Sequence, residues 1–477
     1  MPAPVILWFR RDLRLQDNSA VASALALRVP ILPVYIHDDD LETRSGGAAS
    51  RWWLDKSLHV LDEELRGLSS RLIVLEGSAT ILLPYLCQTY SVKSVICSHT
   101  FDPRSEENDL RIIDELAAIK VCMERHNSTL LTLPCALKTQ GGTPFRVFTP
   151  FFKALQAQGH DRIAMMPPAL SDHWPLPDIW PDSLTIDDLG LRPRLPPSGR
   201  DWSAGFARFT PGERGARKAL RHFLRHDLPG YAGHRDRPDL DVTSHLSPHL
   251  RFGEISPRRI LFELDKHVAA QPDLAADAAK FRAELAWRDF SYNLLHQQPR
   301  LHDVNFREDF NDFPWRDNDP AFRAWCRGET GYDLVDAGMK ELWRTGYMHN
   351  RVRMIAASFL VKHLLIDWRR GEQWFWDCLL DADPANNPAS WQWVAGCGAD
   401  AAPYFRVFNP ISQAAKFDPH GHYRARYLDG DETQSDKYVK ADKAGVPNAN
   451  PKRSPVIEHA FARQRALDAY QNRGDEG

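Results

Sequence analysis

The first 135 residues alternate between short apolar runs and longer amphipathic stretches, and this alternation restricts the fold more than any other feature. The apolar runs have the length of buried strands. Strands that recur roughly every 30 residues with helices between them form a parallel sheet with right-handed crossovers. We therefore predict a doubly wound α/β domain. Its strands are VILWF (5–9), VPILPVYI (29–36), RLIVLEG (71–77), VKSVIC (92–97) and TLLTL (129–133), with helices near 18–27, 48–69, 80–90 and 106–124.

A second, helical region follows a proline-rich stretch at 167–198 that has no helix or strand period. Such a composition is typical of a connector between domains. The sequence therefore predicts an α/β domain at 1–135, a connector at 136–200 and an all-helical domain at 201–477. The predicted helices of this second half are 211–226, 256–269, 273–297, 333–344, 347–365, 370–380 and 454–471.

Composition agrees with two domains, because 477 residues with 43% hydrophobic side chains exceed the usual size of one core. Arginines follow the first apolar stretch, which is the wrong order for a secretory signal, so we expect a cytoplasmic protein. The seven cysteines are scattered without a CxxC pair, so neither a disulfide framework nor a metal site is expected.

Charge alone leaves nucleic-acid binding open. The formal net charge is −3, yet residues 340–372 carry seven lysines and arginines against three acids. This local excess suits either a phosphate-binding face or an ordinary solvated helix surface.

The stretch from 284 to 393 is rich in tryptophan and amide side chains where a helical core would use leucine, isoleucine and valine. Such side chains suit a pocket for flat ring systems. Glu284 and Trp287 are three residues apart, and Asn350 and Met354 four apart, so each pair shares a helix face. The alternatives are a surface ion pair and ordinary core residues.

Two further groups have both a functional and a structural interpretation. No GxGxxG follows the first strand, but Thr243, Ser244 and Ser247 could bind a pyrophosphate or simply cap a helix. Three tryptophans, at 315, 368 and 391, could conduct electrons or fill the core.

Seven blocks, in order along nearly the whole chain, resemble the cryptochrome/photolyase family. A further block, SRWWLDKSLHVLDEELR (50–66), resembles plant cryptochromes, and the combination is similar to bacterial class III photolyases. The seven blocks are ILWFRRDLRLQDN, TSHLSPHLRFGEISPR, WRDF, TGYMHNRVRM, SFLVKHLLIDWRRGE, NNPASWQW and DAAPYFRVFNP.

The resemblance implies a helical domain that holds FAD, active as FADH⁻. The residues matching positions at its phosphates and ribose are Tyr231, Thr243, Ser244 and Ser247. Arg353 matches a residue beside the ring system, Asp381 and Asp383 match acids near the adenine and the ring edge, and Asn387 matches the position facing flavin N5. Trp315, Trp368 and Trp391 match a photoreduction chain, and Trp374 and Trp376 suggest a branch.

The resemblance also implies light-driven electron transfer to a cyclobutane pyrimidine dimer flipped out of DNA. The matching pocket residues are Glu284, Trp287, Asn350, Met354 and Trp393, of which Glu284 and Asn350 would be catalytic, while Arg235, Arg344 and Arg351 would bind phosphates. His349-Asn350 replaces the His-His pair of (6-4) photoproduct enzymes, and Asn387 replaces the aspartate of plant cryptochromes. Both differences favour dimer repair.

Two other functions and one cofactor stay open. The chain could be a cryptochrome-type blue-light receptor that signals through flavin redox state, or a nucleotide-binding adaptor without photochemistry. The resemblance to class III photolyases favours methenyltetrahydrofolate as antenna, with Glu106 and Glu107 as candidate contacts. We expect a monomer.

Overall fold

The computed structural model describes residues 2–159, 174–192, 201–401, 405–430 and 454–472 and contains two compact units. The first unit comprises residues 1–194, 209–229 and 244–299. The second comprises residues 195–208, 230–243 and 300–477. The units therefore alternate along the chain, and the domain boundaries expected near 135 and 200 stay a prediction.

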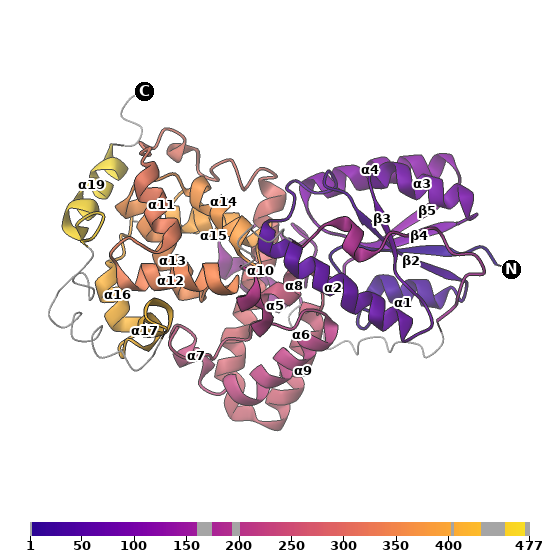
Figure 1. Ribbon diagram of the computed structural model, residues 1–477, viewed down its shortest axis with the longest axis horizontal. Helices are drawn as coiled ribbons and strands as arrows, with labels where there is room; N and C mark the ends of the chain where they lie inside the picture. Colours follow the sequence, from indigo (N-terminus) through magenta and orange to yellow (C-terminus); the bar gives the residue numbers. More distant parts are fainter. Residues whose placement is uncertain (1, 160–173, 193–200, 402–404, 431–453, 473–477) are drawn as a thin grey trace. The chain divides into compact units, whose positions relative to one another are not determined.

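A parallel sheet with strand order β3-β2-β1-β4-β5 forms the centre of the first unit. Every residue of the central strand β1 is buried, because strands pair with both of its edges and helices cover both faces of the sheet. Two helices cover each face, α1 and α2 on one side and α3 and α4 on the other (Figure 1). The doubly wound α/β prediction is confirmed. The elements are β1 (Val5–Phe9), α1 (Ser19–Ala26), β2 (Ile31–His37), α2 (Ala48–Arg66), β3 (Ile73–Glu76), α3 (Ala79–Thr89), β4 (Ser94–Ser98), α4 (Pro103–Ala118) and β5 (Cys122–His126).

The predicted position of the fifth strand is wrong. The structure places β5 at Cys122–His126 instead of 129–133, and the helix before it ends at Ala118. β5 is an edge strand whose residues are exposed or half-buried, so it lacks the apolar run of an inner strand. Residues 129–132 of that run are a buried loop, in which the N–H groups of Leu131 and Thr132 donate to the Asp289 carboxylate at 2.7 and 3.0 Å, and Leu133 is exposed.

Several helices complete the first unit, and three of them lie close to predicted ranges. The helix α5 was not predicted, because it lies inside the range assigned to the connector. In this unit α10 packs against both α5 and α9. These elements are α5 (Phe148–Ala157), α6 (Glu213–His222), the π-helical turn η3 (Phe223–Asp227), α8 (Ser247–Arg251), α9 (Pro257–Ala270) and α10 (Ala275–Gln297).

The described part of the second unit is helical, as the sequence predicted. Its core includes the buried side chains of Trp325, Phe359, Trp368 and Trp391. Within the described ranges, no helix is both long and apolar enough to cross a membrane. The α-helices are α7 (Tyr231–His234), α11 (Asp319–Arg327), α12 (Asp333–Thr345), α13 (Asn350–Ser358), α14 (Trp368–Cys378), α15 (Asn386–Ala395), α16 (Pro410–Phe417), α17 (His422–Leu428) and α19 (His459–Gln471); a π-helical turn (Phe359–His363) follows α13.

Gly253 brings the turn after α8 against the loop that follows β1. Its φ is +63°, and a Cβ at this position would lie 2.0 Å from the carbonyl oxygen of Arg11. We expect Gly253→Ala to lower the free energy of unfolding by about 3 kcal/mol, because both the backbone conformation and the close approach would be lost. Gly46→Ala is the control, since the nearest atom to its new Cβ is 3.7 Å away. Denaturant unfolding followed by circular dichroism checks both variants, and equal stability would contradict the explanation.

Candidate active site

Arg353 of α13 and the buried Asp381 form an ion pair in the second unit. The two terminal nitrogens of Arg353 donate to the two carboxylate oxygens at 3.0 and 2.9 Å, and its Nε donates to the Met348 carbonyl at 2.7 Å. Burial alone would lower the pKa of Arg353, but the Asp381 carboxylate raises it above its usual value. The guanidinium is therefore a fixed positive charge, which stabilises an anionic group placed beside it.

Two hydroxyl groups lie close to this ion pair. The guanidinium carbon of Arg353 lies 5.4 Å from the centre of the Tyr347 ring, and the Tyr347 and Thr243 hydroxyls are 3.3 Å apart. Burial raises the pKa of Tyr347 to about 12, so its hydroxyl is neutral. The structure thus brings together Thr243, Arg353 and Asp381, which the sequence had assigned to one ligand, and adds Tyr347. Tyr231 is buried at the start of α7.

Two carboxylates fix the amino end of α15. One oxygen of Asp383 accepts the backbone N–H groups of Ala385 and Asn386 at 2.9 and 2.8 Å. The side-chain nitrogen of Asn387 donates to the carboxylate of Glu372 at 2.8 Å and to its carbonyl oxygen at 3.1 Å. Glu372 therefore sets the orientation of the Asn387 amide.

The first turn of α13 presents Asn350, Arg351 and Met354 together. Asn350 is exposed, while Met354 and Arg351 are half-buried. Arg351 donates to Asp236 at 2.6 Å, and one of its terminal nitrogens lies 3.7 Å from the Met354 sulfur. The buried His349 caps the helix, because its Nδ1 accepts the N–H of Arg351 at 3.2 Å. The predicted common face of Asn350 and Met354 is therefore present.

A buried glutamate that the sequence analysis missed supports this turn. The Glu341 carboxylate accepts the hydroxyls of Tyr423 and Tyr427 at 2.6 and 3.1 Å and the N–H of His349 at 3.2 Å. Burial raises the pKa of Glu341. No sequence pattern marks this residue, because its partners are the cap of α13 and two tyrosines of α17.

The tryptophans predicted as an electron chain belong to one hydrophobic core, with Trp368 and Trp391 buried in it and Trp315 packed against it. The Trp368 indole donates to Asn305 at 2.9 Å. Trp391 is edge-on to Trp325 and Phe375, with ring centres 6.1 and 5.0 Å apart. Each of these contacts involves only one of the three tryptophans, so electron transfer along them stays a prediction.

The two tryptophans of the suggested branch differ in their surroundings. Trp374 stacks on the exposed Trp343 with ring centres 6.1 Å apart, and Trp376 is buried. Trp393 donates from its indole to the Asp400 carbonyl at 3.0 Å. Trp393 also lines a pocket of about 90 Å³, together with cationic and aromatic side chains such as Lys362 and Phe405.

In the first unit, Glu284 and Trp287 lie one turn apart on α10, as predicted. Glu284 is half-buried, with Lys280 at 3.6 Å from its carboxylate. Phe148 of α5 stacks on Trp287 with ring centres 3.6 Å apart and planes 7° from parallel. A second ring that stacked on this indole would therefore have to use the opposite face.

Ser244 and Ser247 lie at the start of α8, where the Ser244 hydroxyl accepts the N–H of Leu246 at 3.4 Å.

Further along this segment the sequence analysis missed Glu254, which is fully buried. Its carboxylate binds the Trp53 indole at 2.9 Å together with Ser57 and His249. Glu254 thereby joins the α8 segment to α2, the block that resembles plant cryptochromes.

Two family models match the chain. Residues 5–169 match the family model of DNA photolyase, and residues 281–472 match that of the FAD binding domain of DNA photolyase. A deoxyribodipyrimidine photo-lyase of Agrobacterium fabrum is 42% identical over 98% of both chains. The chain belongs to the cryptochrome/photolyase family.

Solved structures of family members have the same fold. A bacterial class III photolyase from Agrobacterium tumefaciens superposes with a TM-score of 0.91 at 40% identity, covering 100% of this chain and 98% of that one. An archaeal photolyase from Sulfolobus tokodaii, crystallised with two FAD molecules, gives 0.80 at 29% identity, covering 98% and 100%. The matched domain identifies FAD as a cofactor of this family member.

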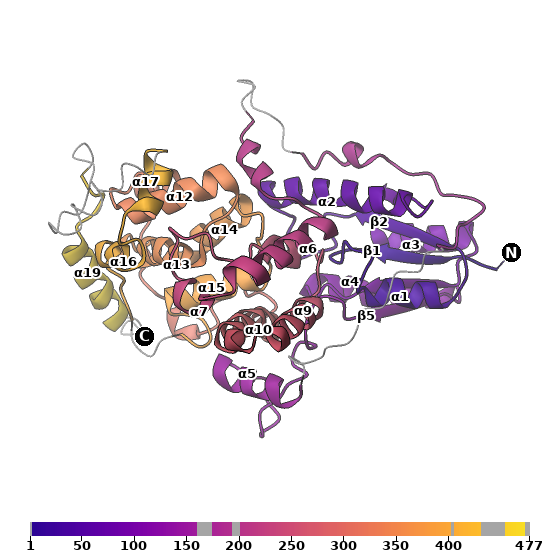
Figure 2. The same ribbon diagram turned by 90° about the horizontal axis from the view of Figure 1, so that it is seen from below.

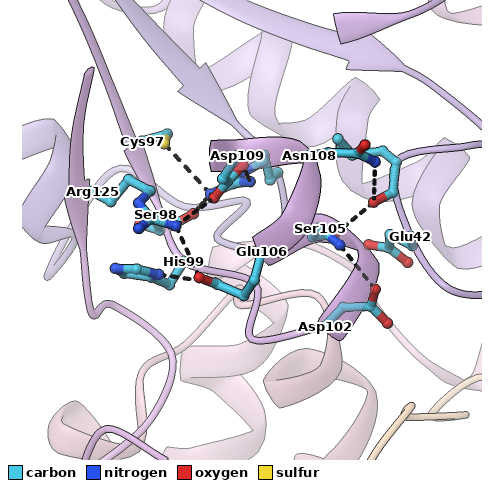
Figure 3. Close-up of polar contacts among 12 residues, drawn as sticks. Glu42, Cys97, Ser98, His99, Asp102, Ser105, Glu106, Asn108, Asp109 and Arg125 are labelled. Atoms are coloured by element: carbon cyan, nitrogen blue, oxygen red, sulfur yellow. Dashed lines mark hydrogen bonds and ion pairs between the residues drawn. The ribbon is translucent and has the colours of Figure 1, made fainter. Parts of the chain in front are cut away.

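In doubly wound proteins the carboxyl edge of the sheet is a usual ligand position, and here it carries a dense polar cluster (Figure 3). Arg10 donates to Asp109 at 2.7 Å. Arg125 donates to Asp109 and Glu106 at 3.1 and 2.9 Å, and His99 lies 3.0 Å from Glu106. Partial burial opposes ionisation of Glu106, but His99 and Arg125 lower its pKa. Glu106 is therefore tied to this cluster, whereas the neighbouring Glu107 is exposed.

His349, the cap of α13, makes the free energy of unfolding depend on pH. Burial lowers the pKa of His349 to about 4, from about 6.5 in an unfolded chain. Between these values the unfolded chain binds more protons, so the free energy of unfolding falls as the pH drops from 6.5 towards 4, by about 2–3 kcal/mol for this group. His349→Asn should flatten this slope, and His420→Asn, at an exposed site, should not. Denaturant unfolding across this range checks both variants, and identical slopes would contradict the assignment.

Proposed function

We propose that this chain is a deoxyribodipyrimidine photo-lyase that uses light to split cyclobutane pyrimidine dimers in DNA. The observation that carries the proposal is the start of α13. Exposed Asn350 and half-buried Met354 share a face there, with the Arg351 guanidinium beside them. An amide that reads a base edge next to a cation that binds phosphate is the chemistry of a damaged-base pocket.

FAD, when bound in its reduced anionic form and excited by light, supplies an electron to the dimer and recovers it after the ring opens. We assign its phosphates and ribose to Tyr231, Thr243, Ser244 and Ser247. The charge of Arg353, fixed by Asp381, would favour an anionic ring beside it. Asp383 is assigned to the adenine and ring-edge region. Asn387 is assigned to flavin N5, with the orientation that Glu372 gives its amide.

The dimer would be bound by Glu284, Trp287, Asn350, Met354 and Trp393. A dimer stacks and pairs poorly, so flipping it out costs less than the few kcal/mol that normal bases require. Glu284 would hydrogen-bond the damaged bases, and the indoles would stack on them. Phosphate contacts from Arg235, Arg344 and Arg351 would make affinity fall with salt.

The remaining assignments follow the class III resemblance. Methenyltetrahydrofolate is proposed as the antenna, although the Sulfolobus tokodaii relative is described with a second FAD. Glu106 and Glu107 stay candidate contacts. We propose a monomer that acts in the cytoplasm.

A repair assay decides between this function and a cryptochrome-type receptor. Reduced protein and an oligonucleotide with one thymine dimer are compared under blue light and in the dark. Return of thymine absorbance only in the light supports the photolyase. Bound FAD without repair supports the receptor, and colourless protein without flavin supports a nucleotide-binding adaptor.

The role of Glu284 can be separated from simple binding. Glu284→Ala should lower the quantum yield of repair several-fold and weaken dimer binding by less than about twofold, because its hydrogen bond would matter most once the dimer carries an electron. The control is Glu263→Ala, which removes a half-buried carboxylate from α9 that pairs with Arg259. Actinometry and fluorescence titration measure the two effects, and equal losses in both would refute this role.

The role of Trp368 is tested by the order of reduction and repair. Trp368→Phe should slow photoreduction of oxidised FAD at least about tenfold while protein reduced chemically beforehand repairs normally, because this indole would serve only flavin reduction. Trp202→Phe, at a half-buried site of the second unit, is the control. Transient absorption follows photoreduction. Failure of the pre-reduced variant would show that Trp368 has another role.

A further inference from the structure

One face of α6 and the following turn is exposed and strongly basic. Arg214, Lys218, Arg221 and Arg225 are all exposed, and their spacing of four, three and four residues places them along one helix face. At 1.5 Å per residue this row is about 16 Å long. The overall charge of the chain is −3, so the row does not reflect a generally basic protein.

The acidic side chain at the start of this helix is turned inward. Glu213 is buried and accepts the backbone N–H groups of Leu15 and Gln16 at 2.9 and 3.3 Å, with Arg217 also bound to it. Ala216, Leu220 and Phe223 bury the opposite face. The fold therefore leaves α6 cationic on its outer side.

Few acidic side chains form ion pairs with the cations of this row. Arg214 lies 3.3 Å from Glu64, and His222 lies 3.5 Å from Asp227. For Lys218, Arg221 and Arg225, no ion pair is found with any residue that the structure describes. Three neighbouring cations without acidic partners repel one another, which is a cost that an anionic ligand would relieve.

The π-helical turn that follows α6 and carries Arg225 contacts the helix of Glu284. Phe223 contacts Phe281 of α10 with ring centres 4.5 Å apart, and Glu284 follows Phe281 by three residues. Figure 2 shows α10 beside α9 in the same unit. DNA bound through Glu284 would thus bring its flanking phosphates to this part of the first unit.

We propose that the outer face of α6 binds the phosphate backbone of the duplex that flanks the lesion, without reading its sequence. This inference rests on the proposed function, because it takes DNA as the substrate. Phosphates of one strand rise about 3.4 Å each, so a row of about 16 Å spans four to five of them. The row carries four cations over this length, about 4.5 to 6 Å apart along the helix axis, and has no aromatic side chain with which to read bases.

The test is a charge-removal variant with a matched control. Lys218→Gln, Arg221→Gln and Arg225→Gln are combined in one variant. The control combines Arg28→Gln, Lys93→Gln and Lys120→Gln, three exposed cations that lie one to three residues before β2, β4 and β5 and so at the amino edge of the sheet. Both variants change the net charge equally. Binding of an undamaged 30-base-pair duplex is measured by fluorescence anisotropy at several salt concentrations.

We expect the slope of log K against log salt to lose about two to three in magnitude in the α6 variant, near 0.9 for each phosphate contact. Each single substitution should remove about a third of this change. The control should bind as the wild type does. An unchanged slope in the α6 variant, or an equal change in the control, overturns the proposal.

The same design separates this inference from the proposed function. Binding of undamaged duplex does not require repair, so it tests α6 even if the wild-type protein repairs no dimer. Flavin content and thermal unfolding are compared in all variants. Since the three side chains are exposed, we expect both to match the wild type.

Discussion

The paired hydrogen bonds between Arg353 and Asp381 are the constraint on which the second unit depends most. They join α13 to the loop after α14, and the same arginine holds the Met348 carbonyl just before α13. Removing one member of such a pair strands a charge, which typically costs about 3–5 kcal/mol. The same helix, α13, carries Asn350, and the guanidinium carbon of Arg353 lies 5.4 Å from the centre of the Tyr347 ring.

Buried carboxylates serve the same purpose elsewhere. Glu341 joins α12 to α13 and α17, and Glu372 orients Asn387. In the first unit, Glu254 joins α8 to α2. Glu341 and Glu254 each collect donors from elements far apart in the sequence, because a buried carboxylate is tolerated only when donors surround it. The segments assigned to FAD and DNA are thus positioned by residues that are not themselves assigned to either ligand.

The sequence predicted the sheet well because inner strands such as Val5–Phe9 are buried on both sides and must be apolar. It misplaced the fifth strand because Cys122–His126 lies at an edge, while most of the apolar 129–133 run, residues 129–132, is buried as a loop. Arg353 and Asp381 were recognised through family resemblance, and the structure pairs them; their ligand roles remain predictions. Glu341 and Glu254 could not be found in this way, because their importance comes from partners on other elements and from burial.

The stacking of Phe148 on Trp287 has a consequence for how selectivity can change. If Trp287 forms one wall of the lesion pocket, Phe148 of α5 forms a second aromatic layer behind it. A base pressed against the indole would be supported by a phenyl ring that never meets it. Sequence drift in α5 could then retune which lesions are accepted while every residue in contact with the DNA stayed the same.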